Sequence, residues 1–250
     1  MRLNVIEAGE GPRLVLLHGV FGAAGNWGAI QKVLAQRYQV MALDLRNHGA
    51  SPHRCGMDYP TLAADVAETL GDRPAAVLGH SMGGKVAMLL ALSRPAWVEK
   101  LIIADIAPVT YAPSLRPYVA AMQAVPLCPG LTRREADAML AAAVPEPGIR
   151  AFLLQNLLLA ETPPRWRLGL AELAAGMPEI EGFPPIAARY AGPTLVLTGG
   201  RSAYVRPEHQ EGFLSLFPAA QFATIPGAGH WLHAEKPAEF LGAVERFLGA

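Results

Sequence analysis

An alternation of short apolar runs with longer amphipathic stretches is the feature that most constrains the fold of this sequence. Most of the apolar runs are bounded by Gly, Pro, Asp or Asn. Buried strands of a parallel sheet have this character, and the stretches between them suit helices that cover the sheet. The pattern therefore predicts an α/β fold with a mostly parallel central sheet flanked by helices. The predicted strands are residues 3–7, 13–17, 39–43, 75–78, 101–104, 194–198 and 221–225.

Amphipathic helices are predicted where apolar residues recur every three or four positions. The last of these helices begins near Pro237, because proline suits the first turn of a helix. We expect these helices to flank the sheet. Their apolar stripes consist of Trp27, Ile30, Val33 and Leu34, of Leu62, Val66 and Leu70, and of Phe240, Leu241, Val244, Phe247 and Leu248.

The alternation is interrupted between about residues 108 and 190, where the sequence contains helical and loop segments but no convincing strand. Prolines separate the helical segments, which are predicted at residues 118–125, 133–144, 149–160 and 165–175. We interpret this stretch as a helical lid inserted into a single domain that spans residues 1–250. The length and the hydrophobic content of 52% fit one domain with a large core.

The balance of charges argues against several kinds of partner. The chain has 21 basic and 21 acidic residues, so we expect no binding to nucleic acid or to an anionic membrane. It contains no apolar run that suits a signal region or a membrane span, which predicts a cytoplasmic protein. Cys55 and Cys128 lie far apart without neighbouring Cys or His, so we expect buried or partly buried free thiols and no metal site. These features do not indicate the oligomeric state.

The sharpest local motif is Gly79-His80-Ser81-Met82-Gly83, which follows a predicted strand and precedes a helix-like run. A serine on a sharp turn between strand and helix needs small residues two positions before and after it, so that the two elements can approach. With six serines and 25 glycines in the chain, this spacing is expected by chance only roughly 0.06 times. Ser81 is therefore the candidate nucleophile, although an ordinary tight turn would also accommodate it.

A serine nucleophile requires a general base, for which histidine has the most suitable pKa. His230 lies on a glycine-rich loop after the last predicted strand, the place where the order serine, acid, histidine puts the base. His233 is the nearest rival, but it lies closer to the final helix. The remaining histidines are expected to be structural or exposed, and they are His18, His48, His53, His80 and His209.

The acid that orients the histidine should lie at the carboxyl end of a neighbouring strand. Asp105 occupies such a position, one strand after the nucleophile. The loop after the strand at residues 194–198 contains no carboxylate before Glu208, which is the alternative. We predict Asp105 as the acid, and the competing interpretation is that its side chain only caps the turn.

An oxyanion hole and an acyl pocket complete the predicted site. The backbone amides of Met82 and Val20 are the expected oxyanion donors, with Phe21 as a second option to Val20. Apolar residues of the lid would shape the pocket, although many of them suit simple helix packing equally well. The predicted substrate-binding residues are Phe21, Leu153, Leu157 and Trp231.

Several longer motifs resemble those of the α/β-hydrolase fold family, and more narrowly those of the YbfF-type esterases and the abhydrolase-domain 11 proteins. The motifs are LLHGVFG, DLRNHGASP, GHSMGGKVAM, DIAPVTY, GGRSAYV and GAGHWLHAEKP, and the resemblance is weakest in the lid. The resemblance implies an α/β-hydrolase fold with Ser81, Asp105 and His230 as the catalytic triad. It also implies hydrolysis of carboxylic esters or acyl thioesters without a metal or organic cofactor.

The sequence thus predicts a serine hydrolase that cleaves esters or thioesters of short to medium acyl chains through an acyl-enzyme. Three alternatives stay open: a carbon-carbon bond hydrolase, a perhydrolase on the same triad, and a non-catalytic protein that binds a small molecule in the pocket. A haloalkane dehalogenase or epoxide hydrolase is disfavoured, because those enzymes use a carboxylate as nucleophile on this fold.

Overall fold

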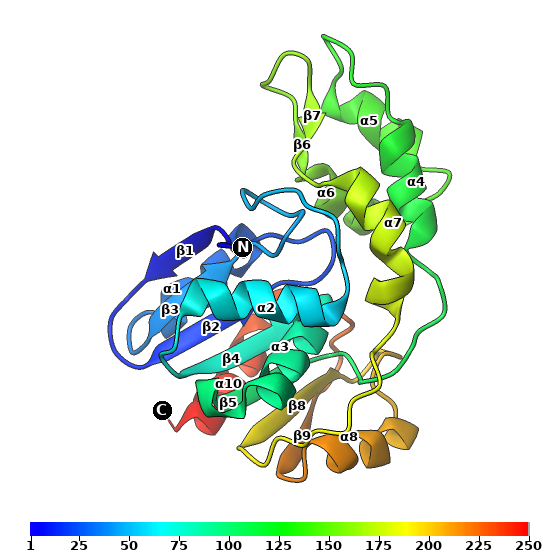
Figure 1. The fold of residues 1–250 in the computed structure, drawn as a ribbon. Helices are drawn as coiled ribbons and strands as arrows, with labels where there is room; N and C mark the ends of the chain where they lie inside the picture. Colours follow the sequence, from blue (N-terminus) through cyan, green and yellow to red (C-terminus); the bar gives the residue numbers. More distant parts are fainter. Residues whose placement is uncertain (250) are drawn as a thin grey trace.

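A seven-stranded sheet forms the centre of the molecule (Figure 1). The structure, a computed structural model, describes residues 1–249. The order of the strands is β1-β3-β2-β4-β5-β8-β9, and all neighbours are parallel except the antiparallel pair β1 and β3. The strands are β1 (Val5–Ala8), β2 (Arg13–Leu17), β3 (Gln39–Leu43), β4 (Ala75–His80), β5 (Val98–Ala104), β8 (Thr194–Gly199) and β9 (Ala220–Ile225).

The predicted strands are confirmed, with differences at their ends. The bounds of β2 and β3 agree with the prediction, because in each strand one polar residue, Arg13 or Gln39, is followed by four buried apolar residues. Strand β5 begins at Val98, earlier than predicted. The polar residues Glu99 and Lys100 interrupt the apolar pattern, so the prediction included only the buried part of the strand. Strand β1 is displaced by one or two residues, since it lies at the edge of the sheet and its burial pattern is only partial.

Helices cover both faces of the sheet, and alternate strand residues supply the two cores. On one face Val15, Val77 and Ile103 share a core with α2 (Tyr59–Leu70), α3 (Met82–Ser93) and α8 (Gln210–Leu216). On the other face Leu16 and Leu78 share a core with α1 (Gly28–Leu34) and α10 (Pro237–Leu248). Short helical turns complete these layers, namely η1 (Ala24–Trp27), η2 (Pro95–Trp97), η3 (Pro207–His209) and α9 (Leu232–Glu235).

A helical insertion separates β5 from β8 and rises above the sheet in Figure 1. It contains α4 (Arg116–Ala124), α5 (Arg133–Leu140), α6 (Pro147–Leu154) and α7 (Leu170–Glu181). The expectation that it has no strand is wrong, because β6 (Leu157–Leu158) and β7 (Arg165–Trp166) pair as a small antiparallel hairpin. The helices predicted at residues 149–160 and 165–175 are therefore interrupted by this hairpin.

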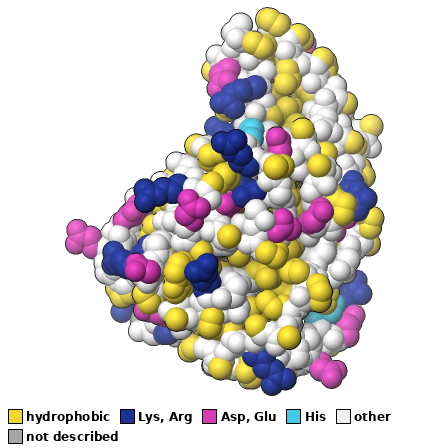
Figure 2. All heavy atoms as spheres, viewed as in Figure 1, with side chains coloured by type: hydrophobic (Ala, Val, Ile, Leu, Met, Phe, Trp, Pro, Cys, Tyr) yellow, Lys and Arg dark blue, Asp and Glu magenta, His cyan; other side chains and the backbone are white. Residues whose placement is uncertain are grey.

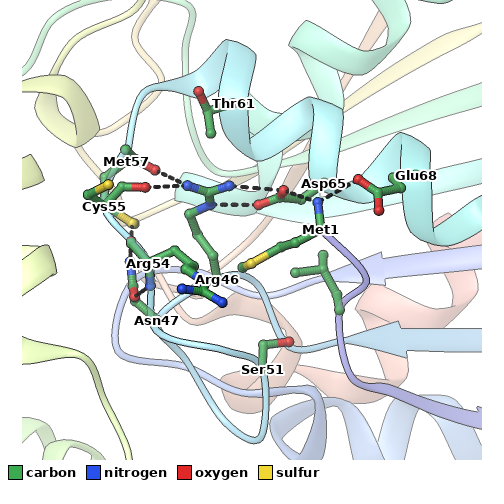
Figure 3. Close-up of polar contacts among 12 residues, drawn as sticks. Met1, Arg46, Asn47, Ser51, Arg54, Cys55, Met57, Thr61, Asp65 and Glu68 are labelled. Carbon is green, nitrogen blue, oxygen red and sulfur yellow. Dashed lines mark hydrogen bonds and ion pairs between the residues drawn. The ribbon is translucent and has the colours of Figure 1, made fainter.

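The loop between β3 and α2 is fastened by a buried ion pair, shown in Figure 3. The Arg46 guanidinium binds the Asp65 carboxylate on α2 through Nε and Nη2, at 2.6 and 2.9 Å. Its Nη1 donates to the carbonyl oxygens of Cys55 and Gly56. The Met1 amino group also donates to Asp65, so one buried carboxylate joins three segments of the chain.

The surface carries both signs of charge, and acidic and basic side chains are interspersed over the face shown in Figure 2.

Cys55 and Cys128 are free and exposed, so the expectation of buried or partly buried thiols is wrong. Both cysteines lie in loops outside the packed core. Among residues 1–249, none of the helices has the length and apolar character required to span a bilayer.

Candidate active site

The candidate nucleophile Ser81 lies on a sharp turn between β4 and α3. Its φ angle of 53° is in the left-handed region, which non-glycine residues rarely adopt. Its amide donates to the Ala104 carbonyl oxygen at 3.0 Å, and its carbonyl oxygen accepts from the amides of Gly84 and Lys85. These bonds hold the turn at the carboxyl end of β4, where Ser81 lines a cavity.

The two glycines of the Ser81 motif are required by close backbone packing. A Cβ atom on Gly79 would lie 2.1 Å from the Gly83 carbonyl oxygen. A Cβ atom on Gly83 would lie 2.5 Å from the carbonyl oxygens of Leu17 and His18. The turn therefore packs between its own helix and the end of β2 with no space for side chains at these positions.

Asp105 is fully buried at the carboxyl end of β5, the strand beside β4. Its Oδ1 atom accepts the Gly199 amide at 2.9 Å. Its Oδ2 atom accepts from His230 Nδ1 at 2.7 Å and from the Ser202 hydroxyl. Three donors thus satisfy this carboxylate, which makes it suited to holding a histidine in one orientation.

His230 lies on the loop between β9 and α9 and lines the same cavity as Ser81. Because Nδ1 donates to Asp105, the neutral ring has its lone pair on Nε2, the nitrogen that a general base uses. Within residues 1–249, Nε2 makes no hydrogen bond. His80, the last residue of β4, donates from its Nε2 to the His230 carbonyl oxygen at 2.8 Å, which ties the end of this strand to the loop that carries His230.

The rival candidates occupy different environments. His233 packs its ring 4.6 Å from that of Trp27, and burial lowers its pKa to about 4. Its Nδ1 atom has no hydrogen-bond partner in the described part of the chain, whereas that of His230 is bonded to Asp105. Glu208 is exposed and forms an ion pair with Arg206 at 3.6 Å. The carboxylate that is bonded to His230 is therefore that of Asp105 and not that of Glu208.

Two backbone amides are available for the predicted oxyanion hole. Met82 is the first residue of α3, and the first amides of a helix have no acceptor within it. On the loop after β2, the Phe21 amide donates to His48 Nε2 at 3.2 Å, so it is already engaged. The Val20 amide makes no hydrogen bond within residues 1–249, and Val20 lines the cavity. The structure therefore favours Val20 over Phe21.

Buried histidines support the loop that carries Val20. His18 Nε2 accepts the Leu45 amide at 3.0 Å, and His48 Nδ1 donates to the Arg46 carbonyl oxygen at 2.7 Å. Burial lowers the pKa of both rings, that of His48 to about 3, so both are neutral acceptors near neutral pH. Residues 45–48, which follow β3, thus fix the conformation of the loop after β2.

The cavity has a volume of about 380 Å³ and lies between the sheet and the helical insertion. Loops at the carboxyl ends of the strands form its floor, and this is where open α/β sheets bind their ligands. The insertion supplies a largely apolar wall of Ser114, Leu115, Tyr118, Ile149, Phe152 and Leu153. An apolar chain attached to a reacting carbonyl would therefore be shielded from water here.

Three of the four predicted substrate-binding residues line this cavity, namely Phe21, Leu153 and Trp231. Leu157 is not among the residues that form its wall. It lies in β6, where it pairs with Trp166 and is buried among apolar side chains. The unpredicted hairpin explains the difference, because it ends α6 before Leu157 and removes this residue from the helix that faces the cavity.

Sequence reasoning missed two side chains that contact the acid and the base. Ser202 donates to Asp105, and the Tyr204 ring stacks on the His230 ring with 4.0 Å between centroids. Both lie in the GGRSAYV motif, and their position directly after β8 was the available signal.

Among residues 1–249, no group of three or more His, Cys, Asp or Glu side chains is arranged to hold a metal ion.

The chain resembles known hydrolases in sequence. The model of the alpha/beta hydrolase family matches residues 14–243. The sn-1-specific diacylglycerol lipase ABHD11 of Mus musculus is 44% identical, over 95% of this chain and 81% of its own. The esterase YbfF of Escherichia coli is 37% identical, over 94% of this chain and 92% of its own.

Solved structures show the same relationship. A structure described as a marine microorganism esterase is 34% identical and superposes with a TM-score of 0.94. The superposition covers 98% of this chain and 99% of that esterase. Sequence and structure therefore agree on an esterase-type hydrolase, and the chain belongs to the alpha/beta hydrolase family.

Proposed function

We propose that this protein is a serine hydrolase that cleaves carboxylic esters or thioesters through an acyl-enzyme. Ser81 is the nucleophile, His230 the general base and Asp105 the acid that orients it. One observation carries the proposal. The 2.7 Å hydrogen bond between Asp105 and His230 Nδ1 is made beside the cavity that both His230 and the strained Ser81 line.

In the first step His230 Nε2 removes the Ser81 hydroxyl proton while the hydroxyl oxygen attacks the substrate carbonyl. The negative charge that develops on the carbonyl oxygen is stabilised by the amides of Met82 and Val20. His230 then gives its proton to the leaving alcohol or thiol, which departs and leaves an acyl group on Ser81. The buried Asp105 carboxylate stabilises the imidazolium during this step.

In the second step a water molecule attacks the Ser81 ester. His230 takes a proton from this water, and the same two amides hold the oxyanion again. Breakdown of the intermediate returns the proton from His230 to Ser81 and releases the carboxylic acid. Each proton that leaves Ser81 or water thus passes through one nitrogen, so no further acid or base is required.

The walls of the cavity favour a short to medium acyl chain. The volume of about 380 Å³ is near the lower end of the range for small-molecule sites. Phe152 and Trp231 narrow it, since their rings pack with 5.9 Å between centroids. The name of the mouse relative, a diacylglycerol lipase, makes glycerol esters a further substrate class to test.

The first prediction concerns the nucleophile. Ser81→Ala should lower kcat for p-nitrophenyl butyrate by at least about 10³-fold, because the acyl group then has no acceptor. Ser215→Ala, which changes an exposed serine on α8, is the matched control and should retain full activity. Turnover by Ser81→Ala at the wild-type rate would refute the assignment.

The second prediction concerns acyl length. Values of kcat/KM for a series of p-nitrophenyl esters and matched glycerol esters should rise from acetyl to a maximum at a short or medium chain and then fall. The reason is that a longer chain would extend beyond the apolar wall of the cavity and expose its methylenes to water. A profile that rises steadily to palmitoyl would contradict this substrate class while leaving the triad intact.

A further inference from the structure

The loop after β2 carries Val20, and it contains a strained turn. We call residues 18–23 the β2 loop. The Gly22 amide donates to the Gly19 carbonyl oxygen at 3.0 Å, which closes a four-residue turn with Val20 and Phe21 at its centre. Of these two central residues, Phe21 has a positive φ angle, of 64°. This combination is typical of a type II turn, whose third position favours glycine, so a phenylalanine there is strained.

Two hydrogen bonds hold Phe21 in this conformation, one at each of its backbone polar groups. Its amide donates to His48 Nε2 at 3.2 Å, and His48 lies in the segment after β3. Its carbonyl oxygen accepts Asn156 Nδ2 at 2.8 Å, and Asn156 belongs to the helical insertion. In the part of the chain that the structure describes, Asn156 is the one residue of the insertion that hydrogen-bonds to the β2 loop. The turn is therefore fixed from two sides.

Asn156 is itself held firmly in the connection between α6 and β6, where its exposure is only 4%. Its Nδ2 atom donates to the Leu153 carbonyl oxygen at 3.2 Å as well as to Phe21. Both acceptors are carbonyl oxygens, so the side-chain amide must present its nitrogen to them. The backbone carbonyl oxygen of Asn156 accepts the Arg167 amide at 2.8 Å. The hairpin of β6 and β7 thus determines where this donor lies.

Other contacts attach the insertion to the core without involving the β2 loop. The Gly169 amide donates to the Asn47 carbonyl oxygen at 2.9 Å. The Tyr59 hydroxyl donates to the Ile180 carbonyl oxygen at 2.6 Å. Because these bonds are independent of Asn156, loss of its side chain should leave the insertion in place and release only the Phe21 carbonyl oxygen.

From these contacts we infer that Asn156 is a positioning residue, which fixes the β2 loop so that the Val20 amide can stabilise the oxyanion. Val20 and Phe21 line the cavity, whereas Asn156 does not, so it acts through Phe21. The inference rests on the proposed function, since it concerns the same oxyanion hole. It gives the insertion a part in catalysis beyond its contribution to the apolar wall.

The kinetic test uses Asn156→Leu, which has a similar size and no donor, with p-nitrophenyl butyrate. We expect kcat to fall roughly 10- to 100-fold, which is less than the loss of a whole oxyanion donor costs. KM should change by less than about threefold, because Asn156 does not touch the acyl chain. The acidic limb of the kcat/KM profile should stay in place, since Asn156 contacts neither Asp105 nor His230.

The neighbouring Gln155 provides a matched control. Its Oε1 atom accepts Asn26 Nδ2 at 3.0 Å, so it also joins the insertion to the core, but it is exposed and does not contact Phe21. Gln155→Ala should therefore retain kcat within about twofold of the wild type. Equal losses in Gln155→Ala and Asn156→Leu would show that any weakening of this contact region lowers the rate, and would overturn the inference.

A second background tests whether Asn156 acts by supporting the strained turn. Phe21→Gly removes the strain, because glycine adopts a positive φ angle as readily as a negative one. Relative to Phe21→Gly alone, the double variant with Asn156→Leu should lose less than about threefold in kcat. If Asn156→Leu costs the same factor in both backgrounds, the inference is wrong.

Thermal unfolding of Asn156→Leu and of a second variant, Asn156→Ala, separates positioning from stability. Both variants should keep one cooperative transition, because the other bonds of the insertion remain. Loss of the fold in both variants would also overturn the inference, since Asn156 would then be required for stability and not for the position of the β2 loop.

A measurement without turnover distinguishes this inference from the proposed function. NMR-detected hydrogen exchange reports the Phe21 amide, which its bond to His48 protects. This amide should exchange faster in Asn156→Leu than in the wild type, and at the wild-type rate in Gln155→Ala. Failure of the proposed function would appear as an inactive wild type in which the change in exchange is still present. Failure of the inference would appear as an active wild type in which Asn156→Leu changes neither the exchange nor kcat.

Discussion

Ser81 and Asp105 share an uncommon backbone conformation, since both have φ angles of 53° directly after a buried strand. A non-glycine residue in this region costs of order 1 kcal/mol and persists only where its surroundings enforce it. In each case the amide is bonded to the neighbouring strand, from Ser81 to Ala104 and from Asp105 to Leu197. The strain is thus held at the two strand ends that present the candidate nucleophile and acid.

Substitution of a motif glycine tests how tightly the turn at Ser81 is packed. Gly79→Ala places a Cβ atom 2.1 Å from the Gly83 carbonyl oxygen, so it should lower the free energy of unfolding by about 3 kcal/mol or more and abolish activity. Gly212→Ala is the matched control, because a Cβ atom at this α8 position meets no atom within 4 Å. Urea denaturation in which both variants match the wild type would contradict the packing argument.

Residues in local sequence motifs could be predicted, whereas residues whose contacts depend on the tertiary structure could not. Ser81 and His230 were predicted from glycine spacing and chain order, and the structure brings them to one cavity. Asp105 was predicted from its place at a strand end, and it is bonded to His230. Ser202 and Tyr204 were missed, because their contacts with Asp105 and His230 arise only when β8 pairs with β5.

One buried lysine of α3 contacts both ends of the helical insertion. Lys85 Nζ donates to the carbonyl oxygens of Val109, Glu181 and Gly182, at 2.9, 3.1 and 2.6 Å. Val109 lies where the chain enters the insertion, and the other two lie where α7 ends. The ammonium also lies 4.8 Å from the centre of the Tyr111 ring. One side chain thus ties both ends of the insertion to the helix that begins after Ser81.

Loss of this lysine should weaken the insertion more than the sheet. Lys85→Met removes the donor to the Val109 and Gly182 carbonyl oxygens, whereas the Glu181 carbonyl oxygen keeps the Tyr111 amide as a donor. We therefore expect a destabilisation of about 2 kcal/mol or more and faster proteolysis between α4 and α7. Lys32→Met, at an exposed position of α1, is the matched control and should behave as the wild type. Thermal unfolding and limited proteolysis measure both effects, and cleavage sites spread evenly over the chain would argue against an anchoring role.

Sequence patterns at the element scale predicted long periodic segments better than short ones. Strands β2 and β3 were placed correctly because each contains an uninterrupted run of four apolar residues. The hairpin of β6 and β7 has two residues in each strand, too few to show the alternation that identifies a strand. Its apolar leucines continue the pattern of α6, so they suggested a longer helix and placed Leu157 in the cavity wall.

Buried neutral histidines make the whole molecule sensitive to acid. Burial lowers the pKa of His48 to about 3 and that of His233 to about 4, and it also lowers those of His18 and His80. An unfolded histidine titrates near pH 6.5. Between these values the unfolded chain binds more protons than the folded chain, so the free energy of unfolding falls as the pH falls.

The size of this acid sensitivity can be predicted. Below about pH 6, each such histidine should lower the free energy of unfolding by up to about 1.4 kcal/mol per pH unit. His48→Gln should reduce the slope of stability against pH by close to one proton, whereas His53→Gln, at an exposed position, should leave it unchanged. Urea denaturation at about pH 4.5 and pH 5.5 measures the slope. Equal slopes in the wild type and His48→Gln would contradict the account.

The fold class could be predicted from the sequence, but the order of the strands in the sheet could not. Alternating elements predicted a mostly parallel sheet, which the structure confirms. The order of the strands did not follow from the sequence, because the pairing of β5 with β8 joins residues separated by the whole insertion. That pairing shapes the candidate site, since it brings Gly199 and Ser202 to the Asp105 carboxylate.

The most direct test of the central claim is to trap the acyl group on the protein. The wild type is mixed with excess p-nitrophenyl butyrate, quenched in acid within the first turnover and analysed by peptide mass spectrometry. We expect a butyryl adduct on the peptide that contains Ser81, and no adduct in Ser81→Ala. A fully active wild type that carries no adduct, or an adduct at another residue, would contradict it.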